Sequence, residues 1–181
     1  MDVHRLWAPG RMKYIEEMKA RKRAGRKEED ECLFCVKLAE PDGPGNLVLV
    51  RRERAAIMLN LYPYNPGHLM IAPFRHVATP RGLLAEEGAE LLRLLALAEE
   101  LLARAFEPEG MNVGMNLGRS AGAGVVGHLH LHVVPRWTGD TNFMPLTAGT
   151  KVMVEEVADT YARLAAVLAG MTLDGAPGCS G

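Results

Sequence analysis

The sequence is poor in cysteine and has no excess of either charge. Its 181 residues include three cysteines, and 21 Lys and Arg residues are matched by 22 Asp and Glu residues. Balanced charge gives no basic surface for a polyanion, so we expect no nucleic-acid partner. An odd and small number of cysteines argues against a secreted domain held together by disulfides.

Long hydrophobic runs are also missing. No apolar segment reaches the about 20 residues of a membrane-spanning helix, so we expect no membrane partner. The first residues, MDVHRLWAPGRMKY, lack the apolar core of a signal peptide. We therefore expect a cytoplasmic protein in a reducing compartment.

The remaining composition suits one globular domain. Hydrophobic residues make up 48% of the chain, and its length is typical of a single domain. We expect an N-terminal arm over residues 1–31 with a helix at 11–23, one folded domain over 32–170, and a tail over 171–181. Residues 19–31 change from basic to acidic, which indicates either a solvated, self-neutralising segment or a basic arm over a polyanionic substrate.

The apolar periodicity predicts an α+β fold. Strand patterns occur at 47–50, 55–61, 68–72, 111–117 and 127–135, and helical patterns at 84–106 and 152–168. Residues 32–38 form only a short apolar segment. Short turns between neighbouring strands favour a five-stranded antiparallel sheet, with one long helix between strands and another at the C-terminus.

A row of histidines marks the candidate site. Three of the six histidines, His128, His130 and His132, alternate with apolar residues. Alternate residues of a strand share a face, so we expect three imidazoles on one face and core residues on the other. Imidazole exchanges a proton near neutral pH, and few structural needs call for three in a row. We interpret this face as the functional site.

Strand geometry limits what the row can do. Alternate residues lie about 7 Å apart and the outer histidines about 13 Å, too far to share one ion through bonds of about 2 Å. Two neighbours could bind one metal, or the histidines could divide nucleophilic and acid or orienting tasks. The preceding loop has Asn116, Arg119 and four glycines in residues 118–127. Its backbone N–H groups can bind phosphate oxygens, which favours phosphoryl or nucleotidyl chemistry.

Cys32 and Cys35 form a second motif with three interpretations. They could be a redox dithiol, zinc ligands or small buried apolar residues. No βαβ pattern surrounds them, which disfavours a thioredoxin-like site. A closed zinc site needs four ligands, and His76 and one histidine of the row are the candidates for the other two.

Together these motifs resemble a known family. The row His128-Leu-His-Leu-His-Val-Val134 resembles the His-φ-His-φ-His-φ-φ signature of the histidine triad (HIT) family of nucleotide hydrolases and transferases. The resemblance extends over roughly residues 32–137, and residues 60–68 with the N-terminal arm are most similar to the diadenosine-tetraphosphate phosphorylase-like branch. The supporting motifs are Cys32-Leu-Phe-Cys35, Asn65-Pro-Gly-His-Leu-Met-Ile-Ala-Pro73 followed by His76, and Asn116-x-Gly118.

The resemblance implies a role for each histidine of the row. His130 would be the nucleophile that attacks the α-phosphorus and carries the nucleotidyl group. His132 would bind phosphate oxygens or assist the leaving group, and His128 would orient His130 through its backbone carbonyl. Asn116 would contact the phosphate end. We interpret His68, at the start of a strand, as structural.

The resemblance also implies nucleotide contacts. Asn60 stands where the family usually has an aspartate for the ribose hydroxyls, and an amide can bind a diol without charge. Typical members carry Gln-Ser or Gln-Thr before the triad, whereas residues 123–126 are Ala-Gly-Val-Val, so phosphate contact would fall to backbone N–H groups. The base pocket would be lined by Met58, Leu61 and Phe34, and the phosphate loop includes Gly118 and Gly124.

A metal and a partner subunit follow from the same resemblance. In zinc-bearing bacterial members the first histidine closes a zinc site, which here would consist of Cys32, Cys35, His76 and His128. The family is usually a homodimer with one sheet continued across two subunits, and we expect the same assembly.

The expected activity is cleavage of a dinucleoside polyphosphate of the diadenosine tetraphosphate type. The enzyme would be a HIT-type hydrolase or nucleotidyltransferase (phosphorylase) that works through a nucleotidyl-His130 intermediate, with water or phosphate as acceptor. Three alternatives remain open: a purine nucleoside phosphoramidate hydrolase, a nucleotide-binding module with negligible turnover, and a zinc protein whose histidines serve only the metal.

Overall fold

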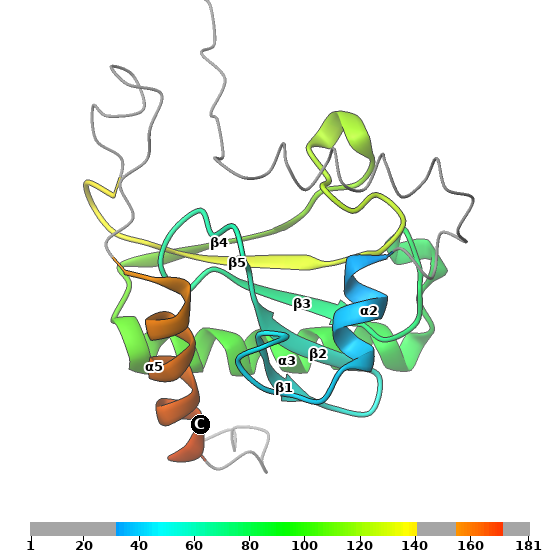
Figure 1. The fold of residues 1–181 in the computed structure, drawn as a ribbon. Helices are drawn as coiled ribbons and strands as arrows, with labels where there is room; N and C mark the ends of the chain where they lie inside the picture. The colour runs from blue at the N-terminus through cyan, green and yellow to red at the C-terminus, as the bar shows by residue number, and fades with distance from the viewer. Residues whose placement is uncertain (1–31, 141–154, 172–181) are drawn as a thin grey trace, which may run out of the picture.

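A five-stranded antiparallel sheet forms the centre of the molecule. The computed structural model describes residues 32–140 and 155–171. The strands lie in the order β1-β2-β3-β5-β4, and all neighbours are antiparallel (Figure 1). They are β1 (Val48–Arg51), β2 (Ala55–Leu59), β3 (Leu69–Pro73), β4 (Gly110–Met115) and β5 (Leu131–Arg136). The predicted α+β class is confirmed.

Within residues 32–140 and 155–171, three α-helices pack around this sheet. The predicted long helix is α3 (Ala85–Phe106), and the C-terminal helix is α5 (Val157–Ala169), later than its predicted start at 152. The short apolar segment at 32–38 forms a further helix, α2 (Leu33–Ala39), because Phe34 and Leu38 lie one turn apart and are both buried. Two 3-10 turns, η1 (Pro80–Gly82) and η2 (Arg119–Ala121), complete the described elements.

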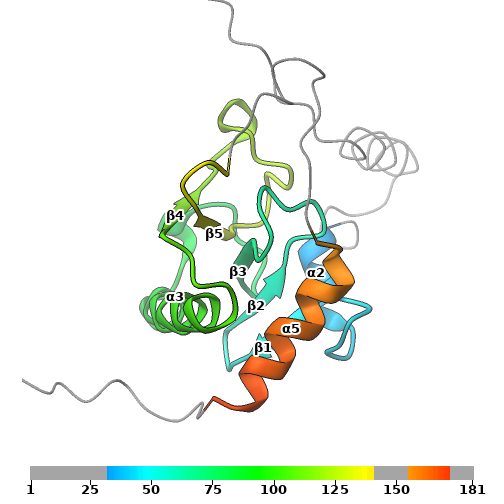
Figure 2. The same ribbon diagram turned by 90° about the vertical axis from the view of Figure 1, so that its left-hand side faces the viewer.

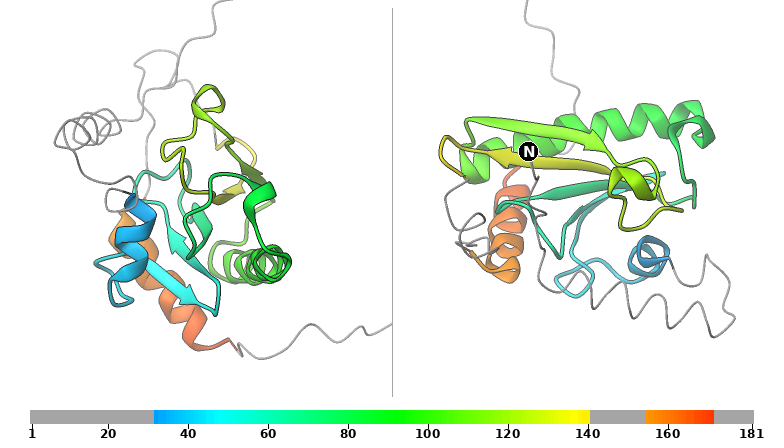
Figure 3. Two further views of the ribbon diagram at one scale, coloured as in Figure 1. Left: turned by 90° about the vertical axis from the view of Figure 1, so that its right-hand side faces the viewer. Right: turned by 90° about the horizontal axis from the view of Figure 1, so that it is seen from above.

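The helices cover opposite faces of the sheet. The core between α3 and the sheet contains Leu94 and Leu101 with Ile71 and Val133, and Leu164 of α5 joins it. On the other face, α2 covers only part of the sheet. The apolar side chains of α2 form a second buried cluster with residues of β1, β2 and β3. Viewed end-on, α3 lies on one side of the strands and α2 on the other (Figures 2 and 3).

Gly67 fixes the entry to β3. Its φ of +78° is in the left-handed region, and a Cβ there would lie 3.0 Å from Leu102 Cδ2 and 3.1 Å from the Phe106 ring. Only glycine fits both the backbone and the space without strain. The 60–67 loop can therefore pack closely on the end of α3 and deliver the next residue, His68, into the interior.

The predicted histidine strand is shorter than expected, and this corrects the picture of a single polar face. Strand β5 begins at Leu131, so only His132 of the three histidines lies in the ladder. The register places Pro73 opposite residue 129, and proline has no N–H to continue the ladder. Leu129 instead donates its N–H to the carbonyl of Val77 (2.6 Å).

Some expectations lie outside the described residues. These are the N-terminal arm with its helix at 11–23, residues 152–154 of the helix expected at 152–168, and the tail from residue 172 onward. Within 32–140 and 155–171, none of the helices has both the length and the apolar character needed to cross a bilayer.

Candidate active site

The histidines of the row meet α2 at the carboxyl end of β3. The His128 and His130 side chains are buried. The Phe34 ring, carried by α2, lies over both of them, with centroid distances of 5.2 Å to His128 and 4.7 Å to His130. The rings of His130 and His132 are 4.9 Å apart and nearly perpendicular. The residues before β5 thus form a compact imidazole cluster and not an extended row.

Hydrogen bonding determines which nitrogen of His130 is reactive. Nδ1 lies 2.8 Å from the backbone carbonyl oxygen of His128, which can only accept, so Nδ1 carries the hydrogen. In the neutral ring the lone pair is then on Nε2. Burial lowers the pKa of His130, against the opposing effect of the bond to His128. The ring is therefore neutral at pH 7 and has the form a nucleophile requires.

A similar argument assigns the hydrogen of His132 through His68. The backbone N–H of Tyr64 donates to His68 Nδ1 (3.1 Å), so a neutral His68 carries its hydrogen on Nε2. That Nε2 lies 2.9 Å from His132 Nδ1 and donates to it. The hydrogen of a neutral His132 is consequently on Nε2. The fold presents His132 as a donor beside a nucleophile, which is the arrangement needed to bind or protonate an oxygen.

His128, the first histidine of the row, points toward the two cysteines of the Cys32-Leu-Phe-Cys35 motif. Its Nε2 donates to the carbonyl oxygen of Pro73 (2.8 Å), which leaves the lone pair on Nδ1. Nδ1 lies 3.3 Å from Cys32 Sγ and 3.5 Å from Cys35 Sγ. Burial is the main reason that the pKa of His128 is lowered from 6.5 to about 4, with smaller contributions from His76 and His130. A neutral imidazole whose Nδ1 lone pair points toward two cysteine sulfur atoms is suited to bind a metal ion.

Cys32, Cys35, His76 and His128 form one cluster that could hold a metal ion. Their ligand atoms all lie within 4.8 Å of one another, and His76 Nδ1 is 3.3 Å from Cys35 Sγ. Tetrahedral zinc with bonds of about 2.0–2.3 Å needs ligand atoms about 3.3–3.8 Å apart. Three of the six ligand-atom pairs, at 3.3–3.5 Å, match that requirement, and the other pairs lie within 4.8 Å. The residues and their spacing therefore fit a tetrahedral ion.

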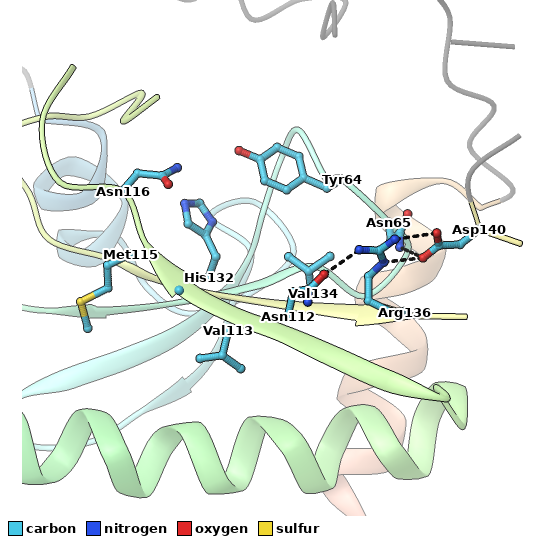
Figure 4. A pocket seen from close by; sticks show the side chains of 11 residues that line it. Tyr64, Asn65, Asn112, Val113, Met115, Asn116, His132, Val134, Arg136 and Asp140 are labelled. Carbon is cyan, nitrogen blue, oxygen red and sulfur yellow. Dashed lines mark hydrogen bonds and ion pairs between the residues drawn. The ribbon is translucent and has the colours of Figure 1, made fainter. Parts of the chain in front are cut away.

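A cavity of about 420 Å³ opens on the other side of His132 (Figure 4). His132 and Asn116 lie at one end, and Arg136 and Asp140 lie at the other. Gly114 faces His132 across β4 and β5, so no side chain fills the space between them. The cavity gives a ligand access to His132 and to the predicted phosphate contact Asn116.

The predicted base and ribose residues occupy different environments. Phe34 and Met58 are buried in the cluster beneath α2, whereas Leu61 is 51% exposed. Asn60 accepts the N–H of Tyr62 through Oδ1 (2.9 Å), and its Nδ2 lies 3.3 Å from His68 Nδ1. The amide predicted to contact ribose therefore also holds the loop that approaches His68.

The glycine-rich loop has no side-chain hydrogen-bond donors at residues 123–126. Ala123 is buried, Val125 packs against the α2 cluster and Val126 is exposed. Gly118 has a φ of +85°, in the left-handed region, and Gly124 is exposed. Between residues 123 and 126 only backbone groups could contact phosphate, and such contacts stay a prediction.

Sequence reasoning missed the residues on the far side of His132. The sequence predicts a structural role for His68 but not the contact of its Nε2 with His132 Nδ1 at 2.9 Å. Tyr64, Asn65 and Asp140 also line the cavity. The only signal for them was the Asn-Pro-Gly-His motif, which marks the loop but does not reveal its contact with β5.

Comparison with known proteins agrees with this geometry. The family profile of the HIT domain matches residues 44–139, more than half of the chain. The chain belongs to the HIT family. An AP-4-A phosphorylase from Mycobacterium tuberculosis is 40% identical over 166 residues, which cover 91% of this chain and 84% of that protein.

Solved HIT structures share the fold. A hypothetical histidine triad nucleotide-binding protein from Sulfolobus tokodaii is 28% identical with a TM-score of 0.59, over 76% of this chain and 89% of the other. A Zn-bound histidine triad family protein from Mycobacterium smegmatis has a TM-score of 0.56 at 24% identity, over 78% and 96% of the two chains. The sheet and its helices are thus those of HIT proteins.

The buried neutral state of His128 predicts acid sensitivity of the metal-free protein. Its folded-state pKa is lowered to about 4, so the unfolded chain takes up the proton first, near pH 6.5. The contribution of His128 to the free energy of unfolding is fully present above about pH 6.5. It decreases as the pH falls toward 4, and the total loss is at most about 3 kcal/mol. Urea unfolding of chelator-treated protein between about pH 7 and pH 5, where most carboxylates stay ionised, measures this loss. The His128→Asn variant should show a shallower pH dependence, and an unchanged slope would contradict the assignment.

Proposed function

We propose that this chain is a HIT enzyme that cleaves a dinucleoside polyphosphate of the diadenosine tetraphosphate type through a nucleotidyl-His130 intermediate. The observation that carries the proposal is the pair of fixed tautomers. His130 offers an Nε2 lone pair, and His132, with its ring 4.9 Å away, offers an Nε2–H. Nucleophile and donor are thus set side by side before substrate arrives.

In the first step, His130 Nε2 attacks the α-phosphorus. A P–N bond forms, the P–O bond to the leaving nucleoside polyphosphate breaks, and the leaving oxygen keeps the electron pair. The imidazole gains positive charge, which the carbonyl oxygen of His128 stabilises through Nδ1–H. His132 Nε2–H hydrogen-bonds the departing oxygen or donates its proton to it.

In the second step, an acceptor oxygen attacks the same phosphorus, the P–N bond breaks, and His130 returns to its neutral form. We propose that inorganic phosphate is the acceptor. The support is the similarity to an AP-4-A phosphorylase, which is 40% identical to this chain over 84% of the phosphorylase's length. With diadenosine tetraphosphate the products are then ADP and ATP, whereas attack by water would give AMP and ATP.

Phosphate contacts in this scheme come from Asn116 and the loop backbone. Asn116 lines the cavity beside His132 (Figure 4). Two loop glycines, the half-buried Gly118 and the exposed Gly124, have no side chain that would cover their backbone N–H groups. Phe34, Met58 and Leu61 would contact the base and Asn60 the ribose.

A binding module with negligible turnover is less well supported. Binding alone requires neither a buried neutral His130 nor a second imidazole with its hydrogen fixed by His68. Burial also lowers the pKa of His130 and so disfavours the positively charged ring. A ring that served only to attract phosphate would need that charge. The arrangement is better suited to catalysis than to sequestration.

The product pattern and one variant test the proposal together. Wild-type protein should convert diadenosine tetraphosphate into ADP and ATP only when phosphate is present, as measured by chromatography. The His130→Ala variant should lose turnover by roughly 10³-fold or more while AMP affinity in calorimetry changes little, because the nucleophile is lost and the pocket is kept. A His130→Ala variant with the wild-type rate would refute the intermediate, and AMP plus ATP as products would refute phosphate as acceptor.

We propose that the Cys32, Cys35, His76 and His128 cluster binds a structural zinc ion. The support is the match of the ligand separations to a tetrahedral site and the Zn-bound relative from M. smegmatis. Bound zinc would supply a cross-link that ties α2 to the segment after β3, which carries His76, and to the end of the glycine loop, which is followed by His128.

The zinc proposal predicts metal-dependent stability. The Cys35→Ser variant should lose bound zinc by elemental analysis and show a Tm lower by about 10 °C, because a metal that binds only the folded state stabilises it. Cys179→Ser is the matched control, since Cys179 is not one of the four proposed ligands, and this variant should keep its zinc. Equal zinc content in Cys35→Ser and wild type would contradict the site.

We propose a homodimer that extends the sheet through β4. Within the described sheet β4 is an edge strand, and Val113 on it is 48% exposed. Leu92 of α3 is 67% exposed, so apolar side chains are available for a partner. Exposed edges of this kind are usually covered.

Light scattering tests the dimer. Val113→Arg should shift the mass from dimer toward monomer, because the charge would be desolvated in the interface. Val36→Arg, at a similarly exposed valine on α2 (43%), should stay dimeric. A monomeric wild type, or a dimeric Val113→Arg variant, would rule out this assembly.

A further inference from the structure

Asp140 lies at the end of the cavity opposite His132, and its carboxylate is held by several donors (Figure 4). Arg136 binds it in a bidentate manner, with Nε 2.5 Å from Oδ2 and Nη2 2.8 Å from Oδ1. The backbone N–H of Trp137 lies 3.3 Å from Oδ2. Hydrogen bonds from Arg136 are the main reason that the pKa of Asp140 is well below its usual range, so the group is a carboxylate at all working pH values.

Asn65 connects this carboxylate to a distant part of the chain. Its Nδ2 donates to Asp140 Oδ2 (2.8 Å) and to the carbonyl oxygen of Pro135 (2.8 Å), so both amide hydrogens are used. The side chain is 4% exposed. Buried bonds to a charged acceptor are stronger than neutral ones. Asn65 therefore fastens the 60–67 loop to the end of β5.

The same loop fixes the hydrogen on His68. The carbonyl of Asn65 accepts the His68 N–H (3.1 Å), and the adjacent Tyr64 donates its N–H to His68 Nδ1 (3.1 Å). The Tyr64 ring also lies against the His68 ring, at a centroid distance of 4.6 Å. Displacement of the loop would remove the Tyr64 N–H from His68 Nδ1 and leave only the longer contact of 3.3 Å to Asn60 Nδ2. His68 could then carry its hydrogen on either nitrogen, and its bond to His132 could reverse.

We propose that Asp140 and Asn65 are positioning residues that fix His132 as an Nε2–H donor, acting through the 60–67 loop and His68. The catalytic part of this inference rests on the proposed function, in which His132 assists the leaving group. The structural part does not, because it concerns only which ring nitrogens of His68 and His132 carry hydrogen.

The spacing of the contacts distinguishes this arrangement from an ordinary ion pair. Arg136 and Asp140 are four residues apart, as are Arg104 and Glu100 on the surface of α3. The carboxylate of Glu100 is 52% exposed, whereas that of Asp140 is 10% exposed. Asn65, 75 positions from Asp140, converts a local pair into a connection between β5 and the loop before His68.

The direct test is the tautomeric state of the histidines in the full-length protein. Long-range ¹H–¹⁵N spectra above about pH 8, where His is neutral, should show His68 and His132 as Nε2–H tautomers in the wild type. In Asn65→Ala and in Asp140→Asn, both rings should show mixed tautomers. The kcat for diadenosine tetraphosphate should fall about 10- to 100-fold with little change in KM, because only the donor function of His132 is impaired.

A double variant that exchanges the amide and the carboxylate between positions 65 and 140 keeps the test informative if a single variant folds poorly. Asn65→Asp places two carboxylates together and should be severely impaired. Combining it with Asp140→Asn restores a donor and an acceptor between the two positions and should recover part of kcat and the single tautomer of His132. Glu100→Gln, which removes the surface pair on α3, is the matched control and should change neither measurement.

Each outcome is decisive. Unchanged tautomers in well-folded Asn65→Ala and Asp140→Asn would overturn the proposal, whatever happens to kcat. Altered tautomers with an unchanged kcat would overturn the catalytic role of the connection. If the wild type turns over no dinucleoside polyphosphate while the variants alter the tautomers, the proposed function fails and the positioning of the histidines stands.

Discussion

The hydrogen bond from His130 Nδ1 to the carbonyl oxygen of His128 is the contact on which the site depends. It places the lone pair of the buried ring on Nε2 and provides an acceptor when that ring becomes positively charged. The carbonyl can serve in this way because His128 is itself anchored. His128 Nε2–H donates to the carbonyl oxygen of Pro73, and His128 Nδ1 faces the two cysteines. One residue thus connects the nucleophile, the end of β3 and the candidate zinc cluster.

Pro73 is the reason that this geometry exists. A regular strand from residue 127 would have placed the three imidazoles about 7 Å apart with similar surroundings. Because proline cannot donate to the ladder, the pairing ends there, and the carbonyl of Pro73 is available to His128. The chain before β5 then departs from the sheet. His128 turns toward the cysteines, while His130 and His132 come within 4.9 Å of each other.

The sequence was informative where periodicity or a motif carried the signal. It predicted the sheet, the long helix α3, the histidines of the candidate site and the four residues of the candidate metal site, but it placed the histidines in an extended row and not in a compact cluster. It did not predict the helix α2, because seven residues are too few for a clear helical period. It also missed the contact of His68 with His132 and of Asn65 with Asp140, which join positions 64 and 75 residues apart. Such contacts depend on how the 60–67 loop packs against β5, and no local pattern encodes that packing.

The most direct test of the account is to trap the intermediate and locate it. Wild-type protein would be mixed with diadenosine tetraphosphate in the absence of phosphate, quenched under alkaline denaturing conditions that preserve a P–N bond, and analysed by peptide mass spectrometry. The account predicts an adenylyl group on His130 that disappears, with release of ADP, when phosphate is added before the quench. Turnover without any label on His130, or a label on His128 or His132 in its place, would contradict it.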